Sequence, residues 1–390
     1  EKVFFKTFVK LFEAESNISV NLSYVTPANL IAQIEAEHTA GVIDTDVIMV
    51  DTAHMSPYIE NGWMQDVAAI LGGFSGRTIT NRFAASMSQG NKVYFVPVSM
   101  DIYISIYNVA ALPYMPVSVT VTRGEDDRIT QIDAITWEEY AAWAITIKAE
   151  TGFAKAGFPM AAMNSQLLYP MGGMALAFGE ESFPNLNGIG AMAAWGLISQ
   201  MVTADAFIAA SVLASVNQPT ALLNTGALWL GFGHLGPIGA AYDAAPEQYI
   251  LGPTPAADAT GIAGSTVGAW AYGIVAGAPH SAVAGKWLEF MTDPEINYLY
   301  CSGLGGVISP IEEAISQLGT SNTDRIMAIG IAMFQNDSHI AIVDTMAYTS
   351  WDEVKAIYLE LFRYLLTGEE LTQAQADGYQ AELDALLVSP

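Results

Sequence analysis

Two aspartates stand beside short apolar runs in the first third of the chain, and their carboxylates are well suited to hold a polar ligand. Asp51, followed by Thr52, ends the run at 45–51, and Asp101 is flanked by apolar residues between two β-rich runs. A carboxylate accepts several hydrogen bonds at once, and burying it without partners is costly. Each therefore predicts a site that receives hydrogen-bond donors. The alternatives are a helix cap for Asp51 and an ordinary turn residue for Asp101.

Other chemistries find less support in the sequence. Paired carboxylates are also what a glycosidase needs, but GxSxG, HExxH and glycine-rich phosphate loops are absent. The five histidines lack metal-ligand spacing, and His54 and His280 are interpreted as surface or loop residues. The single Cys301 excludes an internal disulfide. We expect a binding protein with no cofactor and no metal, rather than an enzyme or a purely structural surface protein.

Strands that alternate with helices must position these side chains. A strand at 45–51 delivers Asp51 to its tip, and a helix at 56–69 follows. Two more strands are predicted at 93–96 and 102–107, with Pro97 interrupting the ladder between them. This alternation predicts an α/β fold with a mostly parallel sheet, in which ligands lie beyond the strand tips.

The second of those runs alternates apolar and polar side chains, which places Tyr103 on a different face from its isoleucine neighbours. Capping boxes are predicted at Thr136–Glu139 and at Ser309–Glu312. The other predicted elements are helices at 1–15, 27–39, 136–152, 188–202, 281–291, 351–367 and 371–387, a hairpin at 117–135, and strands at 227–232 and 267–275.

The composition limits both the architecture and the partners. The chain has 390 residues, 52% of them hydrophobic, so two domains are expected. It carries 14 Lys and Arg against 40 Asp and Glu, a net charge of -26, which argues against nucleic acid and anionic membrane partners. The candidate site stretches lack Lys and Arg, which favours a neutral sugar or polyol over a phosphate. The scarcity of bases leaves an acidic habitat, a saline habitat and compositional drift as alternatives.

Several stretches in order resemble one family. They are TDVIMVDTAHMSPYIENGWMQDV at 45–67, VPVSMDIYISIYN at 96–108, TWEEYAAWAITIKAETG at 136–152, TGALWLGFGHLG at 225–236, AGKWLEFMTDPEINYLYCSGLGGVISP at 284–310 and LLTGEELTQAQADG at 365–378. Together they resemble the extracellular solute-binding proteins of sugar-binding ABC importers, the family of maltose- and trehalose-type binding proteins. The resemblance covers nearly the whole chain.

The resemblance implies a two-lobed α/β fold of the type II periplasmic-binding-protein kind. Its ligand cleft is expected between lobes that hinge crossings join. The expected lobes are 1–107 with 265–307, and 108–264 with 308–390. The implied function is the extracytoplasmic, monomeric component of an ABC importer, which passes a neutral sugar to a membrane permease. The alternatives are another small polar solute or a carbohydrate-active enzyme.

The resemblance also suggests particular ligand residues. Asp101 matches an acidic sugar ligand, Trp351 a tryptophan that stacks on a sugar ring, and Trp270 an aromatic found in some disaccharide binders. His234 replaces a family tryptophan and would stack less well. Trp137, Trp143 and Trp287 are expected in the core. The full expected ligand set is Asp51, Thr52, Asp101, Tyr103, Asn164, Gln166, His234, Trp270 and Trp351.

Overall fold

A computed structural model describes residues 2–157, 167–208, 218–258, 263–335, 340–342, 345 and 347–388. Within it the chain forms two compact units, each assembled from separate segments. Unit 1 consists of Glu1–Met100, Gly268–Gly319 and Ile342–Met346. Unit 2 consists of Asp101–Val267, Thr320–Ala341 and Ala347–Pro390. The chain thus passes repeatedly from one unit to the other.

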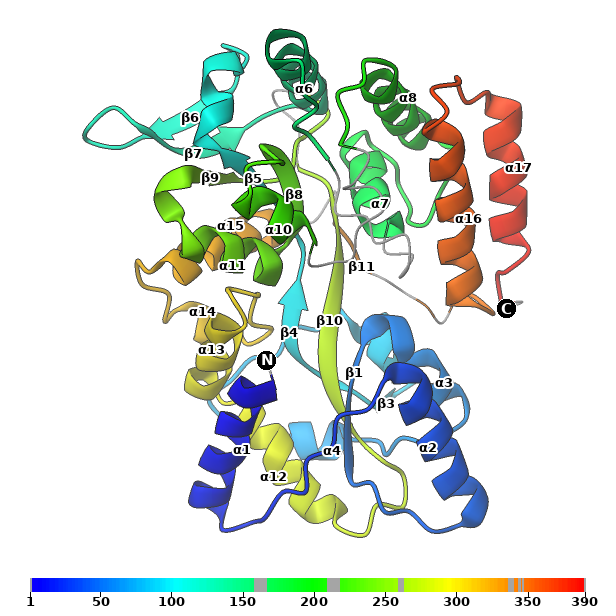
Figure 1. The fold of residues 1–390 in the computed structure, drawn as a ribbon. Coiled ribbons are helices and arrows are strands. Elements are labelled where there is room, and N and C mark those ends of the chain that lie inside the picture. Colours follow the sequence, from blue (N-terminus) through cyan, green and yellow to red (C-terminus); the bar gives the residue numbers. More distant parts are fainter. Residues whose placement is uncertain are drawn as a thin grey trace. The chain divides into compact units, whose positions relative to one another are not determined.

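The long strand β10 (Ser265–Ile274) organises the sheet of unit 1 (Figure 1). It pairs with β1 (Val47–Asp51), with β4 (Val96–Asp101) and with β11 (Ile340–Ile342). The β1 pairing is antiparallel, and its register runs from Val47 opposite Ile274 to Asp51 opposite Trp270. Asp51 therefore stands at the end of a half-buried strand, at the strand tip that the sequence predicts.

Aromatic packing holds the first helix, α1 (Lys2–Ser16), on unit 1. Phe8 and Phe12 are buried, and the Phe12 ring meets Trp287 edge-on with centroids 5.1 Å apart. Trp287 lies on α12 (Ser281–Met291) and is 7% exposed, which confirms its predicted place in the core. Phe8 also meets the ring of Tyr300 on α13 (Pro294–Gly303) edge-on. Helix α2 (Pro27–Ala40) follows α1 along the chain.

The predicted helix at 56–69 is wrong. After the 3-10 turn η1 (Thr52–His54), the structure has two short helices, α3 (Ser56–Glu60) and α4 (Ala68–Leu71). Gly62 between them adopts a φ of 69°, which a helix interior does not allow. Met64 forms an isolated antiparallel bridge with Val275, so the residues between the two helices pair with the chain just after β10 and do not continue a helix.

Two further local predictions are wrong. Pro97 lies inside β4 and does not interrupt it. The predicted capping box at Ser309 does not form, because α14 (Glu312–Ile315) has Ile311 at its N-cap. The Ser309 hydroxyl instead donates to Oδ1 of the buried Asn297, 2.5 Å away.

Unit 2 contains a five-stranded sheet in the order β6–β7–β9–β5–β8. The pairings β6–β7, β5–β9 and β5–β8 are antiparallel, and β7–β9 is parallel. The expectation of a mostly parallel sheet is therefore wrong, because β6–β7 form a hairpin and β8 and β9 both run opposite to β5. The strands are β5 (Tyr103–Asn108), β6 (Thr120–Arg123), β7 (Ile129–Ala134), β8 (Leu230–His234) and β9 (Tyr249–Gly252).

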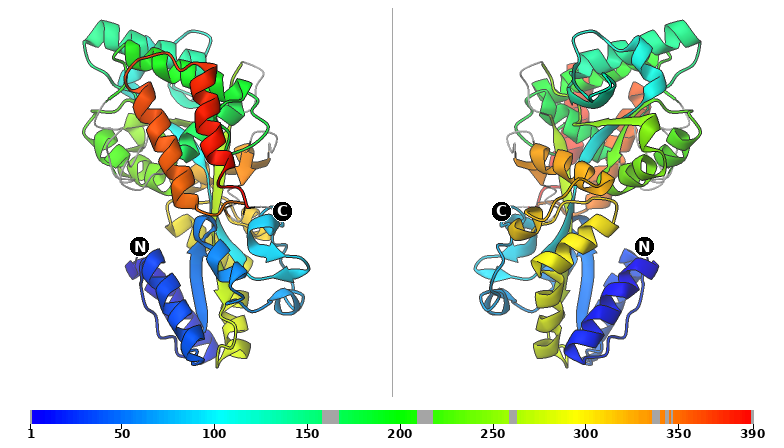
Figure 2. Two further views of the ribbon diagram at one scale, coloured as in Figure 1. Left: turned by 90° about the vertical axis from the view of Figure 1, so that its right-hand side faces the viewer. Right: turned by 90° about the vertical axis from the view of Figure 1, so that its left-hand side faces the viewer.

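The helices of unit 2 include the predicted helix with its capping box, α6 (Trp137–Thr151). Its Trp137 and Trp143 are buried, as predicted. The C-terminal helices α16 (Trp351–Leu365) and α17 (Gln373–Asp384) lie side by side (Figure 2). The unit also contains α7 (Leu168–Ala177), α8 (Ile189–Thr203), α10 (Gln218–Asn224), α11 (Leu235–Ala244) and α15 (Asn322–Gln335).

Short elements complete the described chain, namely α5 (Ala84–Met87), β2 (Ser88–Gln89), β3 (Lys92–Val93), η2 (Val109–Tyr114) and η3 (Pro246–Gln248). The chain crosses from one unit to the other after Met100, Val267 and Gly319, and the segment Ile342–Met346 belongs again to unit 1. The sequence places its lobe boundaries at 107/108, 264/265 and 307/308. Hinge movement about those points stays a prediction.

Candidate functional site

In unit 1, Asp51 stands where β1 turns into η1. Its Oδ1 accepts the backbone N–H of Ala53 at 2.9 Å, so the carboxylate does cap the turn. The same oxygen lies 2.7 Å from Nδ1 of His54. The side chain keeps 28% of its surface exposed. Capping thus occupies one carboxylate oxygen, while the residue still reaches the surface.

Trp270 faces Asp51 across the strand pair. Directly opposed residues of an antiparallel pair project from the same face of the sheet, and these two are partners in the register of β1 and β10. Trp270 is 43% exposed, which is unusual for a tryptophan within a strand. An exposed indole beside a carboxylate offers an apolar surface and a hydrogen-bond acceptor together.

Thr52, the next predicted ligand residue, is 2% exposed. Its Oγ1 accepts the backbone N–H of Ala269 at 3.4 Å, and its carbonyl accepts the hydroxyl of Thr345 at 3.2 Å. These bonds connect Thr52 to β10 and to Thr345. In this conformation Thr52 supports the Asp51–Trp270 pair, and direct contact with a ligand stays a prediction.

His54 is the residue of this cluster that the sequence reasoning did not select. Its side chain is 31% exposed and its Nδ1 contacts Asp51. The signal that could have identified it is the spacing Asp51-x-x-His54, since a short turn brings such residues together. Tyr58 on α3 lies close by, and burial, with a smaller contribution from the charge of Asp51, raises the pKa of its hydroxyl.

In unit 2, Asp101 performs a related role at the end of β4. Its Oδ1 accepts the backbone N–H of Leu235, the first residue of α11, at 2.9 Å. A carboxylate is favoured at a helix N-terminus. Its Oδ2 lies 3.5 Å from Nδ1 of His234, and this buried nitrogen forms no hydrogen bond within the described residues. Asp101 and His234 are 27% and 25% exposed.

Tyr103 and His234 are also a register pair, on β5 and β8. Their ring centroids are 4.3 Å apart at an interplanar angle of 37°. Burial, with smaller contributions from Tyr169 and Asp101, raises the pKa of Tyr103 well above its ordinary value. The hydroxyl of Tyr103 therefore stays protonated. Asp101, Tyr103 and His234, all predicted from the sequence, form one cluster.

Trp351 is the first residue of α16 and is 7% exposed. Its Nε1–H donates to the hydroxyl of Tyr169 at 3.1 Å. Its ring contacts Phe183 and Tyr348. The residue is thus held by the core of unit 2 in this conformation, and its stacking on a ligand stays a prediction. Asn164 and Gln166 lie outside the described residues.

The two clusters share an electrostatic character. The hydrogen bonds and ion pairs that the described structure gives Asp51 and Asp101 come from backbone N–H groups and histidines, not from Lys or Arg. Within the ranges described, no group of three or more His, Cys, Asp or Glu side chains is arranged to hold a metal ion. The clusters therefore offer acceptors to a ligand that brings donors.

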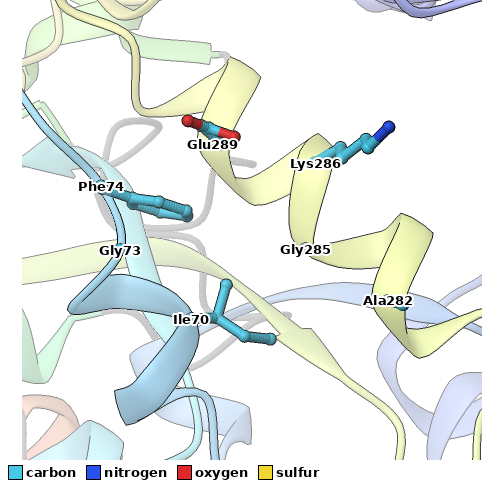
Figure 3. A pocket seen from close by; sticks show the side chains of 7 residues that line it. All are labelled: Ile70, Gly73, Phe74, Ala282, Gly285, Lys286 and Glu289. Carbon is cyan, nitrogen blue, oxygen red and sulfur yellow. The ribbon is translucent and has the colours of Figure 1, made fainter.

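Unit 1 also has a groove between α4 and α12, with a volume of about 240 Å³ (Figure 3). Arg77 stands over the ring of Phe74 at one side, and its guanidinium donates to the hydroxyl of Thr292 at 2.9 Å. None of the predicted ligand residues lines this groove. Its lining is Ile70, Gly73, Phe74, Ala282, Gly285, Lys286 and Glu289.

Comparisons with known proteins place this geometry in context. A family profile described as bacterial extracellular solute-binding protein matches residues 7–328. The search of curated proteins finds no match. No helix among the described residues has the length and apolar character needed to cross a bilayer.

Solved structures resemble the chain over almost its full length. A solute-binding protein of an ABC transporter from Thermotoga lettingae, bound to α-D-tagatose, has a TM-score of 0.73 at 16% identity. The match covers 97% of this chain and 94% of the Thermotoga chain. UgpB from Mycobacterium tuberculosis, in complex with glycerophosphocholine, has a TM-score of 0.75 at 16% identity, and the match covers 98% of this chain and 95% of UgpB. Maltose-bound MalE3 of T. maritima has a TM-score of 0.73 at 15% identity, and the match covers 99% of this chain and 97% of MalE3. These likenesses confirm the predicted two-lobed fold class.

Proposed function

The chain belongs to the bacterial extracellular solute-binding protein family, and on that premise we propose that it binds a neutral sugar or oligosaccharide. The protein acts outside the cytoplasm as the substrate-binding component of an ABC importer. It performs no chemistry on its ligand. Its partner is a membrane permease, and it works as a monomer.

The observation that carries this proposal is the pairing of Asp51 with Trp270. A sugar ring has an apolar C–H face and a rim of hydroxyl donors, so it matches an exposed indole beside a carboxylate. Trp270 is 43% exposed and lies opposite Asp51 on the same face of the sheet. Neither an enzyme mechanism nor a purely structural role requires an exposed tryptophan at that position.

The second cluster supports the same ligand chemistry. Asp101 offers carboxylate oxygens, and Tyr103 adds a hydroxyl that stays protonated. His234 adds a ring nitrogen beside them. Both clusters lie close along the chain to crossings between the units, at Met100–Asp101 and Val267–Gly268. We propose that the protein binds its ligand by hinge closure.

An anionic ligand fits these clusters poorly. Recognition of phosphate or carboxylate relies on Arg, Lys or helix N-termini. The Leu235 N–H at the start of α11 already donates to Asp101, so a carboxylate of the protein occupies that position. Two of the solved relatives are bound to maltose and α-D-tagatose, and a third is in complex with glycerophosphocholine. The glycerophosphocholine complex makes a phosphodiester the sharpest alternative to test.

A thermal-shift panel tests the proposal. The ligands are maltose, trehalose, D-tagatose, glycerophosphocholine, inorganic phosphate and glutamate, each at millimolar concentration. A ligand that binds only the folded state raises Tm in proportion to the logarithm of its concentration over Kd. We expect a rise of several degrees with at least one neutral sugar and none with phosphate or glutamate. A rise with glycerophosphocholine or glutamate, together with no response to the sugars, would contradict the proposal.

A further inference from the structure

We propose that His54 contacts the ligand and determines its specificity, by acting with Asp51 as a pair of adjacent hydrogen-bond acceptors. The pair selects a ligand that presents two neighbouring hydroxyl donors, the vicinal diol of a sugar ring. This inference rests on the proposed function and adds a residue and a selection rule to it.

The first step is the geometry of the pair. Oδ1 of Asp51 lies 2.7 Å from Nδ1 of His54, a short contact for two polar atoms. The same oxygen accepts the N–H of Ala53 at 2.9 Å, and this bond holds the carboxylate in place at the end of β1. An ionised carboxylate can only accept hydrogen bonds. The proton between the two residues therefore resides on Nδ1 of His54.

The second step follows from the tautomer. In a neutral imidazole one ring nitrogen carries the proton and the other is a bare acceptor. With the proton on Nδ1, the Nε2 of His54 is that acceptor. The hydrogen bonds described for His54 do not involve Nε2, and this atom is not among the buried polar atoms that lack partners. Nε2 therefore reaches the surface of unit 1.

The third step places the second acceptor. Oδ2 of Asp51 receives no hydrogen bond within the described residues and is likewise not a buried atom without a partner. Oδ2 and Nε2 therefore belong to two hydrogen-bonded side chains that both reach the surface, and one of them, Asp51, lies opposite the exposed Trp270 in the strand register. Two acceptors beside an apolar ring suit a diol whose C–H face rests on the indole.

The chain provides a matched control at the other end of β1. Asp46 precedes the strand, and its Oδ2 lies 3.1 Å from Nδ1 of His280, which is 68% exposed. This second Asp–His pair has the same chemistry in the same unit but no exposed tryptophan opposite it in the register. His280→Phe removes an equivalent imidazole, so it reports the general cost of losing such a pair.

The experiment measures affinity by titration calorimetry with maltose, trehalose and D-tagatose. It uses the full chain, His54→Phe, His54→Gln and His280→Phe, all at about pH 8, where an imidazole is ordinarily neutral. We expect His54→Phe to lose about tenfold in affinity. His54→Gln should retain part of the affinity, and His280→Phe should match the wild type.

Long-range ¹H–¹⁵N NMR reports whether Nε2 of His54 carries a proton and whether sugar changes its signal. A purely structural role of His54 would not produce such a change. In wild-type protein we expect Nε2 of His54 to be bare at about pH 8 and its signal to shift on addition of sugar. A protonated Nε2 at that pH, or a bare Nε2 that saturating sugar leaves unchanged, would overturn the inference. If none of the three sugars binds wild-type protein while glycerophosphocholine or glutamate does, the proposed function itself has failed. If the wild type binds but His54→Phe binds equally well, only this inference has failed.

Discussion

Trp270 lies directly opposite Asp51 in the antiparallel register of β10 and β1, so an exposed indole and a carboxylate share one face of the sheet. The pair joins the first segment of unit 1 to the segment that returns after Val267. The apolar surface and the acceptor of the proposed site therefore come from distant parts of the chain. This relationship leads to the first prediction.

Trp270→Ala should weaken sugar binding by about 1–2 kcal/mol, because it removes the apolar surface beside Asp51. Stability should change little, since the side chain is 43% exposed. Titration calorimetry and urea unfolding measure the two effects. Trp137→Ala is the contrasting variant, because Trp137 is buried and its removal should lower the free energy of unfolding by about 3–5 kcal/mol. Equal affinities of Trp270→Ala and the wild type would remove Trp270 from the site.

Asp101→Ala should have two separable effects. Loss of a charged acceptor should reduce sugar affinity by about 1.5–3 kcal/mol. Loss of the acceptor for the Leu235 N–H should lower the free energy of unfolding by about 1 kcal/mol. Asp101→Asn keeps an oxygen for Leu235 and serves as the control, so it should restore most of the stability but not the affinity. A folded Asp101→Ala protein with wild-type affinity would show that Asp101 does not touch the ligand.

Trp351 is predicted to stack on the ligand, and in the structure it forms a hydrogen bond to Tyr169. Trp351→Phe removes the Nε1–H that donates to Tyr169, which should lower the free energy of unfolding by about 1 kcal/mol. Combining it with Tyr169→Phe in a double-mutant cycle should give a smaller loss than the sum of the single variants. Trp351→Leu tests the predicted stacking, because it lacks an aromatic ring. If that variant loses no more sugar affinity than Trp137→Leu, Trp351 does not stack on the ligand.

Acid should destabilise the protein gradually. Hydrogen bonds from the N–H groups of Ala68 and then Val93 lower the pKa of Asp66, and a bond from the N–H of Thr78 does the same for Glu313. A carboxyl whose folded pKa is lowered contributes stability above its ordinary pKa of about 4, and this stability is lost as pH falls through the folded pKa. The free energy of unfolding should therefore decline below about pH 4, with a smaller decline in Asp66→Asn.

The fold should nevertheless persist at about pH 3 without added salt. The chain has 14 Lys and Arg and 5 His, so its side chains can carry at most 14 + 5 = 19 positive charges when every carboxylate is neutral. Because these positive charges are few, the repulsion between them in the folded state is weak and should not unfold the protein. Circular dichroism melts from about pH 2 to pH 8 check this. Cooperative unfolding above about pH 3, or a need for molar salt at neutral pH, would contradict the acid-habitat interpretation.

Elements whose signals are local could be predicted from the sequence. The capping box of Thr136 and Glu139 begins α6, and the hairpin of β6 and β7 turns where Asp127 adopts a φ of 62°. Asp51 is predicted at a strand end because an apolar run that stops at a carboxylate is visible in the sequence. Asp101 is predicted at the junction of two strands, and the structure makes it the last residue of β4. In each case the residues that determine the structure lie within a few positions of one another.

Features that depend on distant contacts could not be predicted in this way. Gly62 and Met64 prevent a continuous helix because Met64 pairs with Val275. Ser309 bonds Asn297 on α13 instead of capping α14. His54, interpreted as a surface or loop residue, is a different case, because its partner Asp51 lies only three positions away on a 3-10 turn and the spacing Asp51-x-x-His54 is a local signal. The likeness of Trp351 to a stacking residue did not reveal its bond to Tyr169.

The short return of Ile342–Met346 to unit 1 has a consequence for the timing of folding. Its Thr345 hydroxyl donates to the carbonyl of Thr52, beside Asp51, so the N-terminal unit completes its contacts only after most of the chain has been synthesised. Closing such long loops is slow compared with forming local helices. A newly made chain would therefore leave the ribosome with the contacts of unit 1 still incomplete.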